Sequence, residues 1–489
     1  MDLNAAWIEL LKEAGPGKMM TTAYDTAWVA RLAEIGEPIG ELALEWLREH
    51  QLPDGSWGAE QPCYYHDRVI CTLAAINALG RRARPGDRDR LQRAEAALEV
   101  MTSRLPADRA GETIGFELIA PTLFQETRTL GVLHREEIEA LKSLAPLRSA
   151  KLALLPHGMI NRSVTMAFSA EMAGNDGKGL LDVEHLQEQN GSISYSPSAT
   201  AYFTLYVRPY DPHALAYLHA VAADGTAPNV SPIDVFEQAW VLWNLKLTES
   251  ISDEILQMCH PHLDFLKKDW TTGKGIGFAA NYGSKDSDVT SLVYDVLSSF
   301  GISVDLEAVL RYEQPFYFRC YDFESNPSVS ANIHVLGALR CAGFEKTHSL
   351  VQKVLNFLAG VRTDHTFWFD KWHASPYYAT SHAIISCSSY VDDIVTNAFE
   401  WILKTQNRDG SWGYYMPTAE ETAYCLQALA VHQCHGHKVP LEALHRGSEW
   451  LIQHSEPPYP PLWIGKCLYS PILVVRSAIL SALLMVNLE

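Results

Sequence analysis

Apolar residues recur at intervals of three and four along most of this 489-residue chain. Clear examples lie at residues 91–101, 232–247, 289–300, 351–358 and 422–431. This spacing gathers the apolar side chains on one face of a helix. Runs of alternating β-branched residues bounded by turns, which would indicate strands, are scarce. The pattern therefore predicts an all-α protein.

The most apolar stretch near the C-terminus, residues 471–488, is interrupted by Arg476, Ser477 and Ser481. A membrane-spanning helix needs about 20 predominantly apolar residues, so we predict a buried helix here instead. The N-terminal sequence MDLNAAWIELLKEAG carries acidic residues early and has no long apolar run, which argues against a signal or transit peptide. We expect a soluble, cytoplasmic protein without stable membrane insertion.

Composition adds two constraints. Hydrophobic residues make up 47% of the chain, and a chain of this length usually divides into two domains. The net charge is −19, so a nucleic acid would be repelled over most of the surface. A phosphorylated substrate would have to be bound locally, by a few Lys or Arg side chains or by a metal ion.

The nine cysteines are scattered and form no CxxC pair, which is typical of reduced, mostly buried thiols. The tract HQCHGH at residues 432–437 contains metal-ligating residue types. No second ligand cluster has matching spacing, so we interpret this tract as a polar connection between helices.

A repeat organises the chain. The sequence QLPDGSWG at residues 51–58 recurs as QNRDGSWG at 406–413, with a weaker copy, QNGS, at 189–192. The last two copies are each followed by Thr-Ala-Tyr, at 422–424 and 200–202. Asp-Gly favours a tight turn, Ser can cap the next element, and Trp can pack over the preceding helix end. Repeated units of this kind indicate stacked helix pairs, here in α/α barrels.

These units resemble the Gln-Trp motifs of triterpene cyclases and class II diterpene cyclases. The segments AYDTAWVA at 23–30, IGFELIAPTL at 114–123 and SPSATA at 196–201 resemble γ-domain motifs of class II diterpene cyclases. FEQAW at 236–240 and GIG at 275–277 resemble the run that leads to the catalytic acid. The likeness covers nearly the whole chain and is strongest toward bacterial enzymes that make halimadienyl (tuberculosinyl) or kolavenyl diphosphate.

The resemblance implies a βγ architecture of two α/α-barrel domains without a class I α domain. Residues 1–17 and 211–489 would form the β domain, which carries the acid motif. Residues 18–210 would form the inserted γ domain. The active site would lie between the two.

Protonation of an isolated alkene needs a strong, positioned acid in a dry cavity, and burial or a like-charged neighbour keeps a carboxyl protonated by raising its pKa. DSD at 286–288 supplies two carboxyls, although this spacing alone is common on surfaces. Its position after 275–277 resembles the family's DxDD motif, which implies Asp288 as the general acid and Asp286 as its polarising neighbour. Val289 replaces the motif's last Asp and cannot hydrogen-bond, so other groups must tune the acid.

His334 falls where the family has an Asn or His that hydrogen-bonds the acid, and Asn332 is the neighbouring candidate. Such a bond would orient the proton toward the substrate. The alternative interpretation is a histidine that is merely satisfied within the core.

A diphosphate needs cations. By resemblance, Lys371 in FDKW matches a lysine that contacts the diphosphate, and Arg162 lies where relatives have a basic residue. Magnesium is the expected ion, since it prefers oxygen ligands and phosphate. The family's acidic γ-domain motif is degenerate here, which leaves Asp108, Glu112 and Glu117 as candidate ligands.

A carbocation is stabilised by aromatic faces at about 0.5–2 kcal/mol per contact. Because aromatic residues at helical spacing mostly fill cores, we expect only some of the candidates to line the cavity. The six candidates are Trp240, Trp368, Trp372, Tyr377, Tyr378 and Tyr424.

The sequence DDIVTNAFE at 392–400 fits the metal-binding pattern of class I terpene synthases, which ionise the diphosphate. No DDxxD motif precedes it at a suitable distance, and two barrels leave no room for a class I domain. We interpret it as a chance pattern at a helix start, so the diphosphate should survive.

The resemblance predicts protonation-initiated cyclisation of geranylgeranyl diphosphate to a bicyclic diterpenyl diphosphate, with a rearranged halimadane or clerodane skeleton. The product would pass to a separate terpene synthase or phosphatase. An unrearranged copalyl-type product and conversion of farnesyl to drimenyl diphosphate are the alternatives. Squalene cyclisation is disfavoured by the few repeats and the lack of an apolar insert. A protein prenyltransferase subunit should show a zinc-ligand set, which is not evident, and a catalytically silent barrel scaffold is the non-enzymatic alternative.

Overall fold

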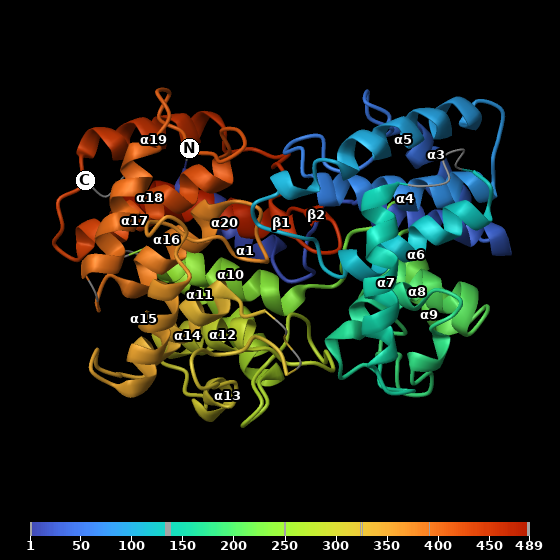
Figure 1. Cartoon of the computed structure of the whole chain (residues 1–489). Helices are drawn as coiled ribbons and strands as arrows, with labels where there is room; N and C mark the ends of the chain where they lie inside the picture. Colours follow the sequence, from blue (N-terminus) through green and yellow to red (C-terminus); the bar gives the residue numbers. More distant parts are fainter. Residues whose placement is uncertain are drawn as a thin grey trace.

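The computed structural model describes residues 2–132, 138–248, 251–322, 324, 326–390 and 392–486. Helices dominate these residues, and the one sheet in this part of the chain is a pair of two-residue antiparallel strands (Figure 1). The prediction of an all-α protein is confirmed. The predicted helix at 471–488 is buried and is described as far as Val486; its last two residues lie outside the described ranges. No helix within those ranges has the length and apolar character to cross a membrane.

The α-helices and strands are α1 (Leu3–Glu13), α2 (Ala23–Ala30), α3 (Pro38–Glu49), α4 (Tyr65–Arg81), α5 (Asp87–Thr102), α6 (Phe116–Thr129), α7 (Glu139–Ala153), α8 (Pro197–Tyr202), α9 (Pro212–Val221), α10 (Asp234–Lys246), α11 (Asp253–Asp269), α12 (Ser287–Ser299), α13 (Glu307–Leu310), α14 (Val329–Cys341), α15 (Ser349–Gly360), α16 (Pro376–Cys387), α17 (Asp392–Lys404), α18 (Ala419–Cys434), α19 (Leu441–Gln453), β1 (Trp463–Ile464), β2 (Leu468–Tyr469) and α20 (Ile472–Val486). Short 3-10 segments include η3 (Thr165–Ala173).

The helices form two closed rings. In the first ring, α10, α12, α14, α16, α18 and α20 contact one another in turn, and α20 returns to α10. Helices α11, α13, α15, α17 and α19 pack outside it, and α1 joins them against α11 and α20. In the second ring, α2, α4, α6, η3 and α8 close in the same way, with α3, α5, α7 and α9 outside. The rings form the two lobes of Figure 1, with β1 and β2 between them.

The buried apolar side chains follow this division. One cluster joins α1 and Tyr195 to the segment from residue 230 onward, and a second covers residues 23–227 together with Cys467. A small third cluster joins Tyr64 to Ala374, Ile464 and Leu468. The predicted domain division, 1–17 with 211–489 and 18–210, stays a prediction. Helix α9, which begins just after residue 211, contributes Ala214 and Leu218 to the second cluster, so the chain returns to the first ring near residue 230.

Three tryptophans close the repeat in the same way. Trp57, Trp368 and Trp412 are fully buried, and each indole N–H donates at 2.8 Å to the backbone carbonyl ten residues earlier. The backbone N–H of each donates to a threonine hydroxyl of the next helix at 3.0–3.1 Å. Trp368 therefore belongs to a further copy of the repeat, because it holds the end of α15 as Trp412 holds the end of α17.

We expect Trp412→Phe to lower the free energy of unfolding by about 2–4 kcal/mol. The substitution leaves a buried carbonyl unpaired and opens a cavity in the core. Denaturant unfolding measures the effect. Trp46→Phe is the control, because the Trp46 ring is only half-buried, stacked on His50. Equal losses in the two variants would contradict a structural role for the repeat.

Candidate active site

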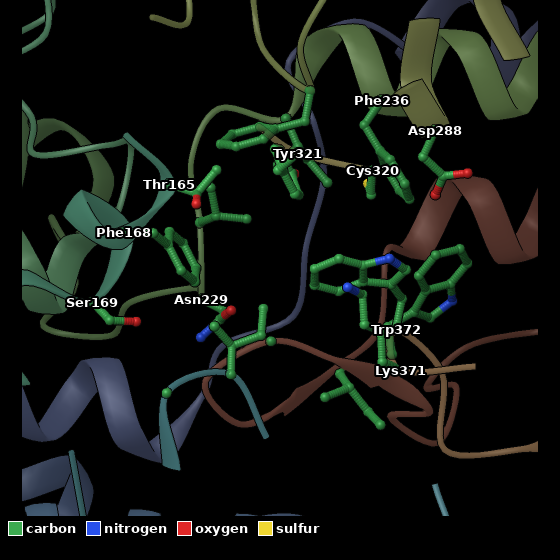
Figure 2. Close-up of a pocket in the computed structure, with 18 of the residues that line it drawn as sticks. Thr165, Phe168, Ser169, Asn229, Phe236, Asp288, Cys320, Tyr321, Lys371 and Trp372 are labelled. Atoms are coloured by element: carbon green, nitrogen blue, oxygen red, sulfur yellow. The ribbon is translucent and has the colours of Figure 1, made fainter. Parts of the chain in front are cut away.

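A cavity of about 370 Å³ lies between the two rings. Its lining is mainly apolar and aromatic, with Trp240 and Asp288 from the first ring and Leu118 from the second. In Figure 2, Ser169 and Asn229 lie on the opposite side of the cavity from Asp288. The cavity thus has one carboxyl-bearing wall and a facing wall with small polar groups.

The two acids of the motif have different positions at the start of α12. Asp286 is the N-cap residue: its Oδ1 accepts the backbone N–H of Val289 at 2.7 Å, and the side chain is buried. Asp288 lies in the first turn and lines the cavity, with 13% of its side chain exposed. The cap orients the first turn, so the second acid faces the cavity while the first lies behind it.

Burial raises the pKa of Asp286 to about 8, and the nearby Asp288 carboxyl adds to the shift. Its Oδ2 has no hydrogen-bond partner in the described part of the chain. The residue predicted to polarise Asp288 is therefore itself held neutral at pH 7.

The raised pKa gives a pH-dependent stability. The pKa of Asp286 is about 8 in the folded protein, whereas an Asp carboxyl in an unfolded chain has a pKa of about 3.8. Its contribution to stability therefore falls as the pH rises between these values. Asn carries no such penalty. We expect Asp286→Asn to gain stability over the parent progressively from pH 4 to 8, by at most about 5 kcal/mol. Thermal unfolding midpoints at several pH values measure the gain.

Asp409→Asn is the matched control, because Asp409 is exposed and hydrogen bonds from Ser411 lower its pKa. Its stability difference from the parent should stay flat between about pH 5 and 8. A flat difference for Asp286→Asn as well would show that Asp286 is ionised in the folded protein.

His334 contacts the acid directly. Its Nδ1 lies 2.5 Å from Asp288 Oδ1, while Asp288 Oδ2 accepts a hydrogen bond from Ser330 at 3.3 Å. Asn332, the neighbouring candidate, does not reach the acid. Its side-chain amide accepts from the backbone N–H of Phe318 and donates to the carbonyl of the same residue. It also donates to the carbonyl of Ser328, the N-cap residue of α14. Its donors and acceptor are thus used to fix the loop before α14.

Lys371 and Trp372 line the same cavity as Asp288 (Figure 2). Of the described lining residues, Lys371 is the one with a cationic side chain. Its ammonium pairs with Glu324 and lies 4.9 Å from the Trp372 ring centre. The preceding Asp370 accepts the backbone N–H of Val329 at 2.8 Å at the start of α14. The FDKW segment therefore connects Lys371 in the cavity lining to α14, the helix that carries His334.

Arg162 lies outside the cavity lining. Its side chain is exposed, and its carbonyl oxygen would lie 2.5 Å from a Cβ placed on Gly283, so the two backbones pack closely. Because Arg162 does not line the cavity, the structure gives no support for its predicted contact with the substrate.

The three predicted metal ligands do not form a preorganised site. Asp108 accepts both the backbone N–H and Nδ1 of His66, at 2.8 and 2.7 Å, and Glu117 pairs with Lys151 at 2.5 Å. Glu112 has an exposed side chain, and partial desolvation together with the nearby Glu117 carboxylate raises its pKa. Because two of the three carboxylates already have cationic or N–H partners, this set does not fit a magnesium site.

Elsewhere in the described residues, one group of metal-ligating side chains comes together: Asp67, Cys71 and Cys467. Asp67 already accepts two backbone N–H groups at 2.8 Å, and burial raises the pKa of both thiols. Of the tract interpreted from the sequence as a polar connection between helices, residues 432–434 instead end α18, and only residues 435–437 belong to the connection to α19.

The six aromatic candidates divide by position. Trp240 and Trp372 line the cavity, and Trp368 closes a repeat in the core instead. Tyr377 packs on Trp401, with ring centres 4.7 Å apart, and is likewise outside the lining. The remaining pair lies deeper in the first ring: the Tyr378 hydroxyl accepts from Trp240 at 3.4 Å, and the Tyr424 hydroxyl donates to Glu420 at 3.0 Å.

Several aromatic side chains of the cavity were not identified from the sequence. Except for Phe236, which is in α10, they lie in loops, in η3 and in the β1–β2 pair, where no helical periodicity marks them. Phe236 stacks on Trp240 with ring centres 4.1 Å apart. The others are Phe168, Phe278, Tyr282, Tyr321, Trp463 and Tyr469.

The hairpin between β1 and β2 joins the rings. Lys466 at its tip is fully buried and bonds Glu171 at 2.7 Å and Ser196 at 2.6 Å. The adjacent Gly465 lines the cavity, and a Cβ there would lie 2.0 Å from the Asn229 side chain. A lysine of the first ring's sequence thus neutralises a buried acid of the second ring, next to the cavity.

Comparison with known proteins identifies this arrangement. Residues 321–458 match the squalene-hopene cyclase C-terminal domain family. The structure of ent-copalyl diphosphate synthase from Streptomyces platensis superposes with a TM-score of 0.79, at 30% identity over 99% of both chains. Fold and cavity thus define a terpene cyclase.

Two curated sequences give the family. A type B diterpene cyclase from Mycobacterium tuberculosis is 47% identical over 98% of both chains. An ent-copalyl diphosphate synthase from a Streptomyces species is 32% identical over 90% of this chain and 87% of its own length. The chain belongs to the class II diterpene cyclases and is an enzyme, as the sequence motifs predicted.

Proposed function

We propose that the enzyme cyclises geranylgeranyl diphosphate to a bicyclic diterpenyl diphosphate and leaves the diphosphate attached. The observation that carries the proposal is Asp288, a carboxyl in the wall of an aromatic cavity, bonded to His334 at 2.5 Å. The cavity volume of about 370 Å³ falls within the usual range for small-molecule sites, about 300–1,000 Å³.

In this proposal Asp288 gives its proton to the terminal alkene. The carbon–hydrogen bond forms as the oxygen–hydrogen bond breaks. Each of two ring closures then makes a carbon–carbon bond from an alkene π bond and moves the positive charge to another carbon. Aromatic faces such as those of Trp240 and Phe236 stabilise the positive charge without attacking it. Loss of a proton from another carbon ends the reaction, so the product is an isomer of the substrate.

Lys371 is proposed to bind the diphosphate, exchanging its partner Glu324 for the phosphate oxygens. Its place in the cavity lining supports this role. Magnesium stays a prediction, because the acidic residues predicted to hold it are occupied by other partners. A cytoplasmic location and transfer of the product to a terpene synthase or phosphatase also stay predictions.

For the carbon skeleton, we propose a rearranged halimadane or clerodane type, on the motif resemblance. The second candidate is a copalyl-type product, favoured by the names of the Streptomyces relatives at 30–32% identity. Farnesyl diphosphate as substrate, giving drimenyl diphosphate, is the third.

The test is incubation with geranylgeranyl or farnesyl diphosphate, with magnesium or with EDTA. Products are identified by mass spectrometry and NMR before and after phosphatase treatment. We expect a bicyclic alcohol only after phosphatase treatment, and only from the C20 substrate. A hydrocarbon released before that step would indicate class I chemistry. Failure of the folded protein to convert either substrate would favour the silent scaffold.

A further inference from the structure

A second histidine lies behind the acid. His382 of α16 is fully buried, and its Nδ1 is 3.0 Å from His334 Nε2. Its ring stacks on Trp243, with centres 4.5 Å apart, and contacts Tyr378 at 4.4 Å. A continuous line of hydrogen bonds therefore runs from the cavity into the first ring through Asp288, His334 and His382. His382 has no role in the reaction proposed above.

His382 is held neutral. Burial lowers its pKa well below the usual value, and His334 and His373 lower it further. From α18 the titratable group that faces His382 is Tyr424, with ring centres 5.6 Å apart. From α10 the facing side chain is Trp243, which does not titrate. A neutral imidazole has one N–H and one lone pair, so His382 either donates to His334 or accepts from it.

The surroundings of the other nitrogen decide between these states. His382 Nε2 is buried without a hydrogen-bond partner in the described part of the chain. A proton on Nε2 would create an orphaned buried N–H, which folded proteins seldom tolerate. With the proton on Nδ1, only a lone pair stays unpaired. The geometry thus favours a His382 that donates to His334.

The direction of this bond sets the next one. If His334 Nε2 accepts, a neutral His334 carries its proton on Nδ1 and donates it to Asp288 Oδ1. The acid proton of Asp288 must then sit on Oδ2. With the opposite tautomer, His334 Nδ1 would accept, and the acid proton would be held between Oδ1 and the imidazole. The orientation of one buried ring thus selects the oxygen that carries the proton.

We propose that His382 is a positioning residue that fixes the tautomer of His334. It thereby places the acid proton of Asp288 on Oδ2, the oxygen that bonds the Ser330 hydroxyl at 3.3 Å rather than His334, and from there the proton transfers to the alkene. This inference rests on the proposed function of Asp288. The His334 N–H also stabilises the carboxylate that forms as the proton leaves, because a hydrogen bond to the charged form makes the acid stronger.

The experiment compares His382→Asn with His382→Phe. An Asn amide N–H can take the position of Nδ1–H, whereas Phe fills the space without a donor. We expect His382→Phe to lower kcat about 100-fold at unchanged KM, and His382→Asn to stay within about tenfold of the parent. His432→Phe, a buried histidine of α18 stacked on His437, is the control and should keep the parental rate.

Rescue by Asn separates positioning from damage to the core. Both variants remove the imidazole ring, but only Asn supplies an N–H toward His334. Asn and Phe variants that are equally impaired would overturn the proposal.

A readout without substrate distinguishes this inference from the proposed function. Nitrogen-15 NMR of the parent, with the His334 and His382 signals assigned by substitution, reports which ring nitrogen carries each proton. We expect protons on Nδ1 of both histidines. A proton on His334 Nε2 alone would overturn the positioning role even if the cyclase is active. If the protein shows the expected tautomers but converts neither substrate, the proposed reaction is wrong and the positioning role of His382 still holds. If His382→Phe does not fold, the Asn variant and these spectra still decide.

Discussion

Asp288→Asn should reduce turnover of the prenyl diphosphate by about 10⁴-fold or more, at the upper end of the range for loss of a general acid. The reason is geometric: among the described lining residues Asp288 and Glu324 are the carboxyls, and Glu324 is paired with Lys371. An amide keeps the shape and the acceptor toward His334 but cannot protonate an alkene. Substrate binding should persist, because the cavity walls are unchanged.

Rates from single-turnover assays and affinities from calorimetry with the inactive variant measure the two effects separately. Asp253→Asn is the control, since this exposed acid also lies in the first turn of a helix, α11, but away from the cavity. Turnover by Asp288→Asn within tenfold of the parent would remove Asp288 from its assigned role.

Lys466→Met should destabilise the protein by about 3–5 kcal/mol, the usual effect of leaving one member of a buried ion pair alone. Glu171 is fully buried beside Lys466, and its other hydrogen-bond donor is the Tyr24 hydroxyl at 2.8 Å. Without the ammonium, the carboxylate lacks a countercharge in a site that water does not reach. Denaturant unfolding measures the loss.

Lys18→Met is the control, because the Lys18 side chain is 57% exposed in its pair with Glu13; its effect should stay within about 1 kcal/mol. The double variant Lys466→Met with Glu171→Gln should recover more than half of the loss, since no unpaired charge is left. A single variant as stable as the parent, or a double variant no better than the single, would show that the pair does not hold the rings together.

The helical rings and the position of the acid could be predicted from the sequence. Helical periodicity is a local property, and the DSD motif at 286–288 follows the GIG turn at a spacing that the family resemblance makes specific. The further copy of the repeat could not be found in the same way. Its turn has the sequence TDHTFW, which lacks Asp-Gly-Ser. The buried Trp368 nevertheless makes the same two hydrogen bonds as the other repeat tryptophans, and only the structure shows these.

The charged residues show where local reasoning fails. Arg162 and Lys466 are both single basic residues in unremarkable contexts, yet one is exposed and the other fully buried. Their surroundings come from segments far apart in the sequence, so neither role is encoded nearby. His382 is similar, because its partner in α14 lies 48 residues away.

The hairpin contact also has a consequence for biosynthesis. Lys466 follows Glu171 by 295 residues, which at about 5–20 residues per second corresponds to about 15–60 s of translation. During this interval the nascent γ-like half can form its helices but holds a carboxylate with no counterion at its centre. Completion of the hairpin then supplies the missing ammonium, so we expect the first-made half to reach its full stability only after Lys466 has been translated.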